Sequence, residues 1–428
     1  MIYLLAIALL LIFLISYYFN GRDFFAPSTM LSLAFLASTI SAIYNIDRWK
    51  FDFGTEAFTI IITCVIITLV INTFAHYYYG RRRPAIYYGK ITPISFPMTL
   101  LSLTVIGGAF IGLLTSIKRI SGGVGTFSLM MQTFRMKNAY STDLENQLPI
   151  WVRQILNLSN SICIIFIFNI IYFWKELKSK QKLENIAVIV SSITASLLTG
   201  GRFSAMCTVI AGFVMYYLLR IKQTKKWRVF KIKSILTVLL IVMAVLYGFY
   251  AVKELVGRES ADTVVEYITH YAGGAIPGLD LYLKSPPAKS SIWGKETFYS
   301  LNNNLRKLRL LNVPYYFAHR EFRVSNGVSI GNVYTALRDY HYDFGLGGMF
   351  ALHLVFSMIF SVSYERLKRK LKDKNIIVFS MMYYCVVFYS ISNTFFANII
   401  SIGFLIRIIM TIALYTLLLE KRPRVRFR

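Results

Sequence analysis

The chain opens with the sequence MIYLLAIALLLIFLISYYF over residues 1–19, which contains no charged side chain. A helix of about 20 apolar residues crosses the hydrocarbon core of a bilayer, because its backbone N–H and C=O groups are all satisfied within the segment. Neither a basic segment before this stretch nor a small-residue cleavage site after it is present. It therefore predicts a retained membrane span and not a removed signal peptide.

The composition extends this conclusion to the whole chain. Of the 428 residues, 56% are hydrophobic and 16% are charged, whereas soluble domains average about 45–50% apolar and 25% charged residues. The excess apolar surface must face lipid, which excludes a soluble protein. The four cysteines each lie alone in an apolar stretch without CxxC or metal-ligand spacing, and we interpret them as packing residues.

Further apolar stretches predict eleven membrane spans in all. The expected spans are residues 1–19, 24–46, 57–79, 93–117, 150–174, 186–199, 203–219, 234–252, 347–364, 375–395 and 398–419. The fold class is thus an all-α, polytopic integral membrane protein with about 11 transmembrane helices, and residues 1–428 form a single membrane domain.

The distribution of basic residues predicts the orientation, because Lys and Arg in short loops resist translocation. They concentrate in one alternating set of connections, which includes residues 80–92, 175–185 and 220–233. These connections are expected to be cytoplasmic, where they contact anionic lipid headgroups and not nucleic acid. The amino terminus is then outside and the carboxyl terminus inside. Two long loops, 118–149 and 253–346, lie outside and carry any extracytoplasmic chemistry.

A tight hairpin is expected at Thr199-Gly200-Gly201-Arg202, which interrupts the apolar stretch from residue 186 to residue 219. The glycines permit the reversal and leave backbone N–H groups near the start of the next helix, where an anion can bind. The Arg202 guanidinium can engage phosphate oxygens bidentately. The alternative is that Arg202 anchors the hairpin among the lipid headgroups.

The long loop 253–346 contains its own helical patterns. Thr263 and Glu266 have the spacing of a capping box, which predicts a short helix that Gly273-Gly274 ends. A second helix is expected at 298–311, with one apolar side. The loop is therefore partly helical.

The most catalytically suitable residues end this loop. Arg338 can bind phosphate, while Asp339, His341 and Asp343 are candidate general bases. Two further arginines, Arg320 and Arg323, lie upstream. Each of these residues by itself is more typical of a salt bridge within the loop, but a cluster of them at the mouth of a helix pair favours a site.

The spans contain no carboxylate of the kind that ion-coupled transporters use as a relay. They do contain Arg407, inside the last span, which needs either a structural partner or an anionic ligand. No P-loop, HExxH, GxSxG or DxD pattern occurs. These observations disfavour metal-dependent transfer from a nucleotide sugar, and we expect neither a metal nor another cofactor.

Two motifs resemble those of bacterial oligosaccharide repeat-unit polymerases, the Wzy-type O-antigen polymerase family. They are the Thr199–Arg202 hairpin and the segment 332–348, with its N-x-x-T and D-F-G-x-x-G elements. The resemblance implies a metal-independent glycosyltransferase of the bacterial inner membrane. Such an enzyme moves a glycan from undecaprenyl pyrophosphate onto another lipid-linked repeat unit at the periplasmic face. It also implies a flippase and a chain-length regulator as partner proteins.

In this role the arginines stabilise the pyrophosphate leaving group, and a carboxylate or imidazole activates the acceptor hydroxyl. The expected pyrophosphate ligands are Arg202, Arg338, Arg320, Arg323 and Arg407, and the expected catalytic residues are His341, Asp343 and Asp339. An O-antigen ligase remains an alternative because it breaks the same donor bond. A lipid-linked oligosaccharide flippase is a third, although the long outer loop counts against it, and a passive export subunit is a fourth.

Overall fold

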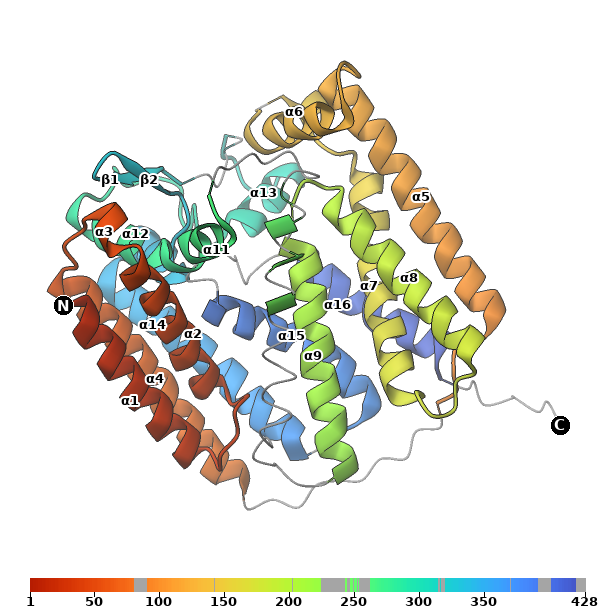
Figure 1. The fold of residues 1–428 in the computed structure, drawn as a ribbon, viewed down its shortest axis with the longest axis horizontal. Coiled ribbons are helices and arrows are strands. Elements are labelled where there is room, and N and C mark those ends of the chain that lie inside the picture. Colours follow the sequence, from red (N-terminus) through yellow and green to blue (C-terminus); the bar gives the residue numbers. More distant parts are fainter. Residues whose placement is uncertain are drawn as a thin grey trace.

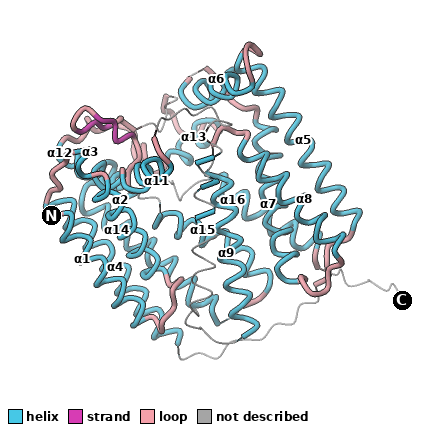
Figure 2. The backbone as a smooth tube through the Cα atoms, in the orientation of Figure 1, coloured by secondary structure: helices cyan, strands magenta, loops and turns pink. Residues whose placement is uncertain are grey.

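The computed structural model describes residues 1–80, 91–141, 143–201, 203–224, 243–244, 247–248, 250–251, 253, 262–314, 316, 320–369, 371–391 and 402–420. Over these residues the protein is mostly helical (Figure 1). Long helices run side by side, and shorter elements gather at one end of them (Figures 1 and 2).

The long helices form two groups. The first group consists of α1 (Ile2–Phe19), α2 (Pro27–Tyr44), α4 (Thr55–Gly80) and α14 (Ala336–Arg369). The second consists of α5 (Phe96–Ser121), α7 (Ile150–Tyr172), α8 (Ser179–Leu197), α9 (Phe203–Thr224) and α16 (Ile402–Leu418). Helix α15 (Asp373–Ile391) packs against α2 and α14 on one side and α9 and α16 on the other, so it joins the two groups.

The short elements occupy connections at one end of the long helices (Figure 1). Between α2 and α4 lies α3 (Ile46–Trp49), and between α5 and α7 lie α6 (Phe127–Tyr140) and the 3-10 turn η1 (Leu144–Asn146). The connection that precedes α14 contains α11 (Val264–Gly273), α12 (Ala275–Lys284), α13 (Tyr299–Lys307), β1 (Arg323–Ser325) and β2 (Val328–Gly331).

The helices confirm a multi-pass membrane protein. Among the described residues, six helices are long and apolar enough to cross a membrane, namely α1, α2, α4, α5, α7 and α14. Two shorter apolar helices lie at Ser204–Arg220 and Ile402–Leu418. Each of the eleven expected spans coincides with a described helix except 234–252, most of which lies outside the described residues. Helix α1 exposes large apolar side chains such as Leu4, Leu11 and Leu14, as a lipid-facing helix does.

Several boundaries differ from the sequence-based expectation. Helix α8 begins at Ser179 and not at residue 186, because the Gln181 side chain accepts a hydrogen bond from the Lys178 N–H at 3.0 Å and caps the first turn. Helix α14 begins at Ala336 and not at residue 347. Its chain changes direction at Gly345 (φ 67°, ψ −171°), a conformation that glycine adopts without strain. The end of the expected outer loop is therefore helical.

The expectation of an all-α chain missed one strand pair. β1 and β2 pair antiparallel, with Ser325 opposite Val328. The two residues between them, Asn326 and Gly327, both have positive φ angles of 51° and 71°. An Asn-Gly pair with this geometry is the favoured two-residue hairpin turn, so the local sequence contained the signal.

Polar side chains join α4 to α14 inside the bundle. The His353 Nε2 atom lies 2.7 Å from the Cys64 carbonyl oxygen and 3.0 Å from the Thr68 hydroxyl. The Thr68 hydroxyl also lies 2.8 Å from that of Ser357. Such buried interhelical hydrogen bonds hold membrane helices together where hydrophobic association is weak.

A buried ionic cluster ties the α1–α2 connection to both helix groups. The Asp23 carboxylate, 1% exposed, accepts hydrogen bonds from Tyr217 on α9 at 3.0 Å and from Tyr364 on α14 at 2.8 Å. The Lys368 ammonium lies 2.9 Å from Asp23 and 3.2 Å from Glu365. Asp23 thus links α9 of one group to α14 of the other.

Candidate functional site

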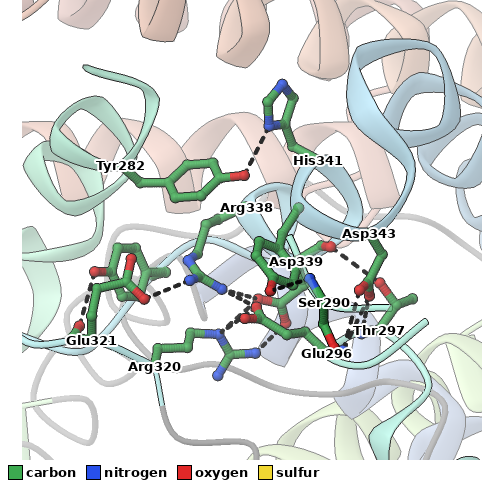
Figure 3. Close-up of polar contacts among 12 residues, drawn as sticks. Tyr282, Ser290, Glu296, Thr297, Arg320, Glu321, Arg338, Asp339, His341 and Asp343 are labelled. Carbon is green, nitrogen blue, oxygen red and sulfur yellow. Dashed lines mark hydrogen bonds and ion pairs between the residues drawn. The ribbon is translucent and has the colours of Figure 1, made fainter. Parts of the chain in front are cut away.

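The candidate site lies at the start of α14, where the segments after α12 and around β1 converge (Figure 3). This first part of α14 carries Arg338, Asp339, His341 and Asp343. The structure therefore brings together four of the residues that the sequence singled out, along with Arg320 and Arg323.

The Arg338 side chain is fully buried and doubly ion-paired. Its Nη1 atom contacts the Glu296 carboxylate, and its Nη2 atom lies 2.7 Å from a carboxylate oxygen of Glu321. The guanidinium carbon lies 4.9 Å from the ring centre of Tyr282 and 4.7 Å from that of Tyr334, which are cation–π distances. A permanently charged group is tolerated at 0% exposure only with such compensation.

The neighbouring arginines are held in the same way. Arg320 forms a two-point pair with Asp339, with Nε 2.7 Å from one carboxylate oxygen and Nη2 in contact with the other. Arg323 donates to the Ser285 carbonyl and to Glu321, at 2.7 Å and 2.8 Å. Both oxygens of Asp339 are thus occupied by an arginine, which makes Asp339 a weaker candidate for the base than the sequence indicated.

The three arginines and three carboxylates form one network, which we call the arginine–carboxylate cluster; its members are Arg320, Arg323, Arg338, Glu296, Glu321 and Asp339. Two of its carboxylates, Glu296 and Glu321, were not among the expected site residues. They lie 42 and 17 positions from Arg338 along the chain, and no local pattern marks them. The cations of the cluster were thus predicted from the sequence, but only one of its anions was.

Asp343 links α14 to the connection that follows α12 through hydrogen bonds to its backbone. One carboxylate oxygen accepts hydrogen bonds from the Thr297 N–H at 2.7 Å and the Glu296 N–H at 3.1 Å. The side chain is only partly buried. Unlike Asp339, it has no arginine on its oxygens in the described contacts, so it keeps acceptor capacity for a hydroxyl group.

His341 pairs with Tyr282 of α12. The Nδ1 atom lies 3.0 Å from the phenol oxygen. Burial raises the pKa of Tyr282 to about 12, so the phenol keeps its proton and can donate it to Nδ1. A neutral imidazole that accepts at Nδ1 carries its own proton on Nε2 and then acts as a hydrogen-bond donor.

Arg407 has no described contact with this cluster. Its Nη2 atom is 3.4 Å from the Asn157 side-chain oxygen on α7, and its Nε atom has no hydrogen-bond partner among the described residues. The one described hydrogen bond of its side chain is thus with α7.

The hairpin around Arg202 is described only in part. Helix α8 ends at Leu197 and α9 begins at Phe203, and Gly200 has a φ of 78°, so the predicted reversal is confirmed. A Cβ atom at Gly200 would lie 3.2 Å from the Arg135 side chain of α6. Arg202 itself lies outside the described residues, and its expected proximity to Arg338 stays a prediction.

These features define a class of protein: a multi-pass membrane protein with a buried arginine–carboxylate cluster in the connections at one end of its helices. Residues 127–269 match the family model described as O-antigen polysaccharide polymerase Wzy. The match confirms the family resemblance and relates this membrane protein to the O-antigen polymerases of polysaccharide biosynthesis. No curated protein and no solved structure is significantly similar to the chain.

The matched segment extends from the start of α6 into α11 and so includes the Thr199–Arg202 hairpin. It ends before the arginine–carboxylate cluster. The roles of the cluster therefore depend on its own geometry.

Proposed function

We propose that the protein polymerises surface glycan by moving an undecaprenyl-pyrophosphate-linked oligosaccharide onto the non-reducing end of another lipid-linked repeat unit. The observation that carries this proposal is the match of residues 127–269 to the O-antigen polymerase family. The concentration of arginines and carboxylates in the connections at one end of the helices supports it. We place the reaction at the periplasmic face of the bacterial inner membrane, in agreement with the basic residues of the opposite connections.

The proposed step exchanges one bond for another. The acceptor hydroxyl oxygen forms a bond to the anomeric carbon, and the bond from that carbon to the pyrophosphate oxygen breaks. The hydroxyl proton passes to a base, and the leaving pyrophosphate takes the electron pair. We assign the base to Asp343, because its oxygens are not occupied by arginine and because His341 is paired with Tyr282.

The developing charge on the leaving group requires cations, which we assign to Arg338, Arg320 and Arg323. Fixed guanidinium groups in a partly dry site stabilise such charge without reorganising. Each is now ion-paired with a carboxylate. A pyrophosphate offers paired oxygens of the same geometry, so it competes with Glu296 and Glu321 for Arg338. Arg202 and Arg407 are proposed as further ligands, and metal independence is part of the proposal.

The test is deletion of the gene in its host, followed by restoration of the wild type, Asp343→Asn or Asp47→Asn. Asp47 lies exposed on α3, in an outer connection, and serves as the matched control. The proposal expects single repeat units without a ladder in the deletion strain. It expects a restored ladder with the wild type and Asp47→Asn, and none with Asp343→Asn at equal protein level.

Two other outcomes would replace the proposal. Long lipid-linked polymer that accumulates untransferred would identify a ligase. Repeat units that stay on the cytoplasmic face would identify a flippase. A functional chain-length regulator and flippase must be present in the host strain, since both are proposed partners.

A further inference from the structure

We propose that Trp293 is a sugar-binding platform that stacks on one ring of the glycan substrate beside Asp343. This inference rests on the proposed function and adds a carbohydrate subsite to it. It starts from an unusual exposure: the Trp293 side chain is 68% exposed although it belongs to an ordered connection. Exposing a ring that could bury about 150–250 Å² forgoes a large hydrophobic contribution to stability.

The backbone around Trp293 is built to hold the ring in place. The indole stacks on Phe298 with ring centres 4.9 Å apart and an interplanar angle of 14°, and its edge meets Phe344 at 5.5 Å. Gly294 has a φ of 60°, and a Cβ atom there would lie 2.4 Å from the Phe298 ring. Only glycine therefore permits this stack. The Asn302 side chain also donates to the Trp293 carbonyl oxygen at 2.9 Å.

The connection that carries Trp293 is fastened to α14 on both sides of the ring. On one side, the Tyr342 hydroxyl accepts a hydrogen bond from the Ser290 N–H at 3.0 Å and donates to the Ala288 carbonyl at 2.9 Å. On the other side, the Thr297 N–H donates to Asp343 at 2.7 Å. The indole is thus fixed relative to the proposed base, as a platform that positions a sugar hydroxyl must be.

The surroundings distinguish this ring from a membrane-facing aromatic residue. On α1, exposed apolar side chains follow one another along the helix, for example Leu10, Leu11 and Leu14. Near Trp293, the exposed residues Lys289 and Ser291 are hydrophilic. One face of the ring is covered by Phe298, and polar groups lie alongside. A sugar ring has the matching chemistry, because it presents apolar C–H groups on its face and hydroxyl groups on its rim.

The experiment uses the full-length protein in lipid nanodiscs and compares Trp293→Ala, Trp293→Phe and Trp174→Ala. Trp174 is a second exposed tryptophan, 53% exposed after α7, and it contacts Lys182 far along the chain from the site. The probe is the repeat-unit oligosaccharide released from the host's own surface glycan, and binding is measured by calorimetry. Polymer length from the lipid-linked substrate is measured in parallel.

The expected result is a loss of oligosaccharide affinity of about tenfold for Trp293→Ala, consistent with the energy of an aromatic stacking contact. Trp293→Phe should retain most of the affinity, because it keeps a flat ring, and Trp174→Ala should match the wild type. Trp293→Ala should also give shorter polymer. Size-exclusion chromatography of each variant verifies that it is folded.

Wild-type affinity and polymer length in Trp293→Ala would overturn the inference. The Trp293 fluorescence is taken as the signal of the wild type minus that of Trp293→Phe. A weaker Trp293 signal in nanodiscs of brominated lipid than in nanodiscs of unbrominated lipid would also overturn the inference, since it would place the ring in the bilayer. The proposed function fails separately: a wild-type protein that makes no polymer refutes it whatever Trp293 does.

Discussion

Asp23 offers the most direct test of how the two helix groups are held together. Its carboxylate accepts from the Phe25 N–H at 3.1 Å and from the hydroxyls of Tyr217 and Tyr364, and it pairs with Lys368 at 2.9 Å. The change Asp23→Ala removes all four contacts at once. Among the described residues, it leaves the Lys368 ammonium, whose side chain is 5% exposed, paired with Glu365.

The magnitude follows from these contacts. Breaking a buried ion pair by removing one partner costs about 3–5 kcal/mol. Because Glu365 still compensates Lys368 at 3.2 Å, we take the lower end, about 3 kcal/mol. In contrast, Tyr217→Phe removes one hydrogen bond from the same carboxylate and should cost about 1.5 kcal/mol, the lower end for a hydrogen bond to a charged group, because the other contacts of Asp23 remain.

The assay is heating in detergent followed by size-exclusion chromatography, with the fraction of monodisperse protein measured against temperature. The expected order of stability is wild type, then Tyr217→Phe, then Asp23→Ala. The triple variant Asp23→Ala/Glu365→Gln/Lys368→Met should be more stable than Asp23→Ala, since it removes both buried charges that the Asp23 change leaves undercompensated. Equal losses in Asp23→Ala and Tyr217→Phe, or no recovery in the triple variant, would contradict this account.

Three further predictions concern the connections at the end of the helices where the candidate site lies. Arg320→Ala leaves the buried Asp339 carboxylate without its two-point partner and should lower the free energy of unfolding by about 3 kcal/mol. The same heating assay measures this loss, and adding Asp339→Asn should restore part of it. Gly273→Ala should destabilise strongly, because a Cβ there would lie 2.6 Å from the α2 backbone, whereas Gly107→Ala, with open space around it, should be neutral. Burial lowers the pKa of His270, so the folded state favours the neutral ring. Thermal stability should therefore fall as the pH drops below about 6.5, with a smaller fall in His270→Gln.

Local sequence predicted a large part of the fold. The capping box of Thr263 and Glu266 starts α11 where expected, with the Thr263 N–H donating to Glu266 at 2.8 Å. The helix expected at 298–311 is present as α13, although it already ends at Lys307. Two residues later, Arg309 has a φ of 59°, which is not a helical conformation. These features depend on residues within one helical turn of each other, so a single sequence contains them.

One glycine pair has a second role that the sequence did not indicate. Gly273-Gly274 ends α11 as expected, and α12 begins directly after it, at Ala275. Gly273 is also required because α11 lies against the backbone of Ser41 and Ala42 in α2. A close approach between distant segments leaves no local pattern, so the sequence offers the glycine but not its reason.

The membrane class, the positions of most helices and the cations of the candidate site can be predicted from the amino-acid sequence, because hydrophobic length and charge are properties of single segments. The partners of these cations depend on how distant segments pack together. The carboxylates that neutralise Arg338 come from the connection before α13 and from the approach to β1. The exposure of Trp293 beside Asp343 likewise depends on hydrogen bonds between α14 and a distant connection. Burial and ion pairing are set by segments that meet only after folding, and they determine which of these charged groups remain able to bind a substrate.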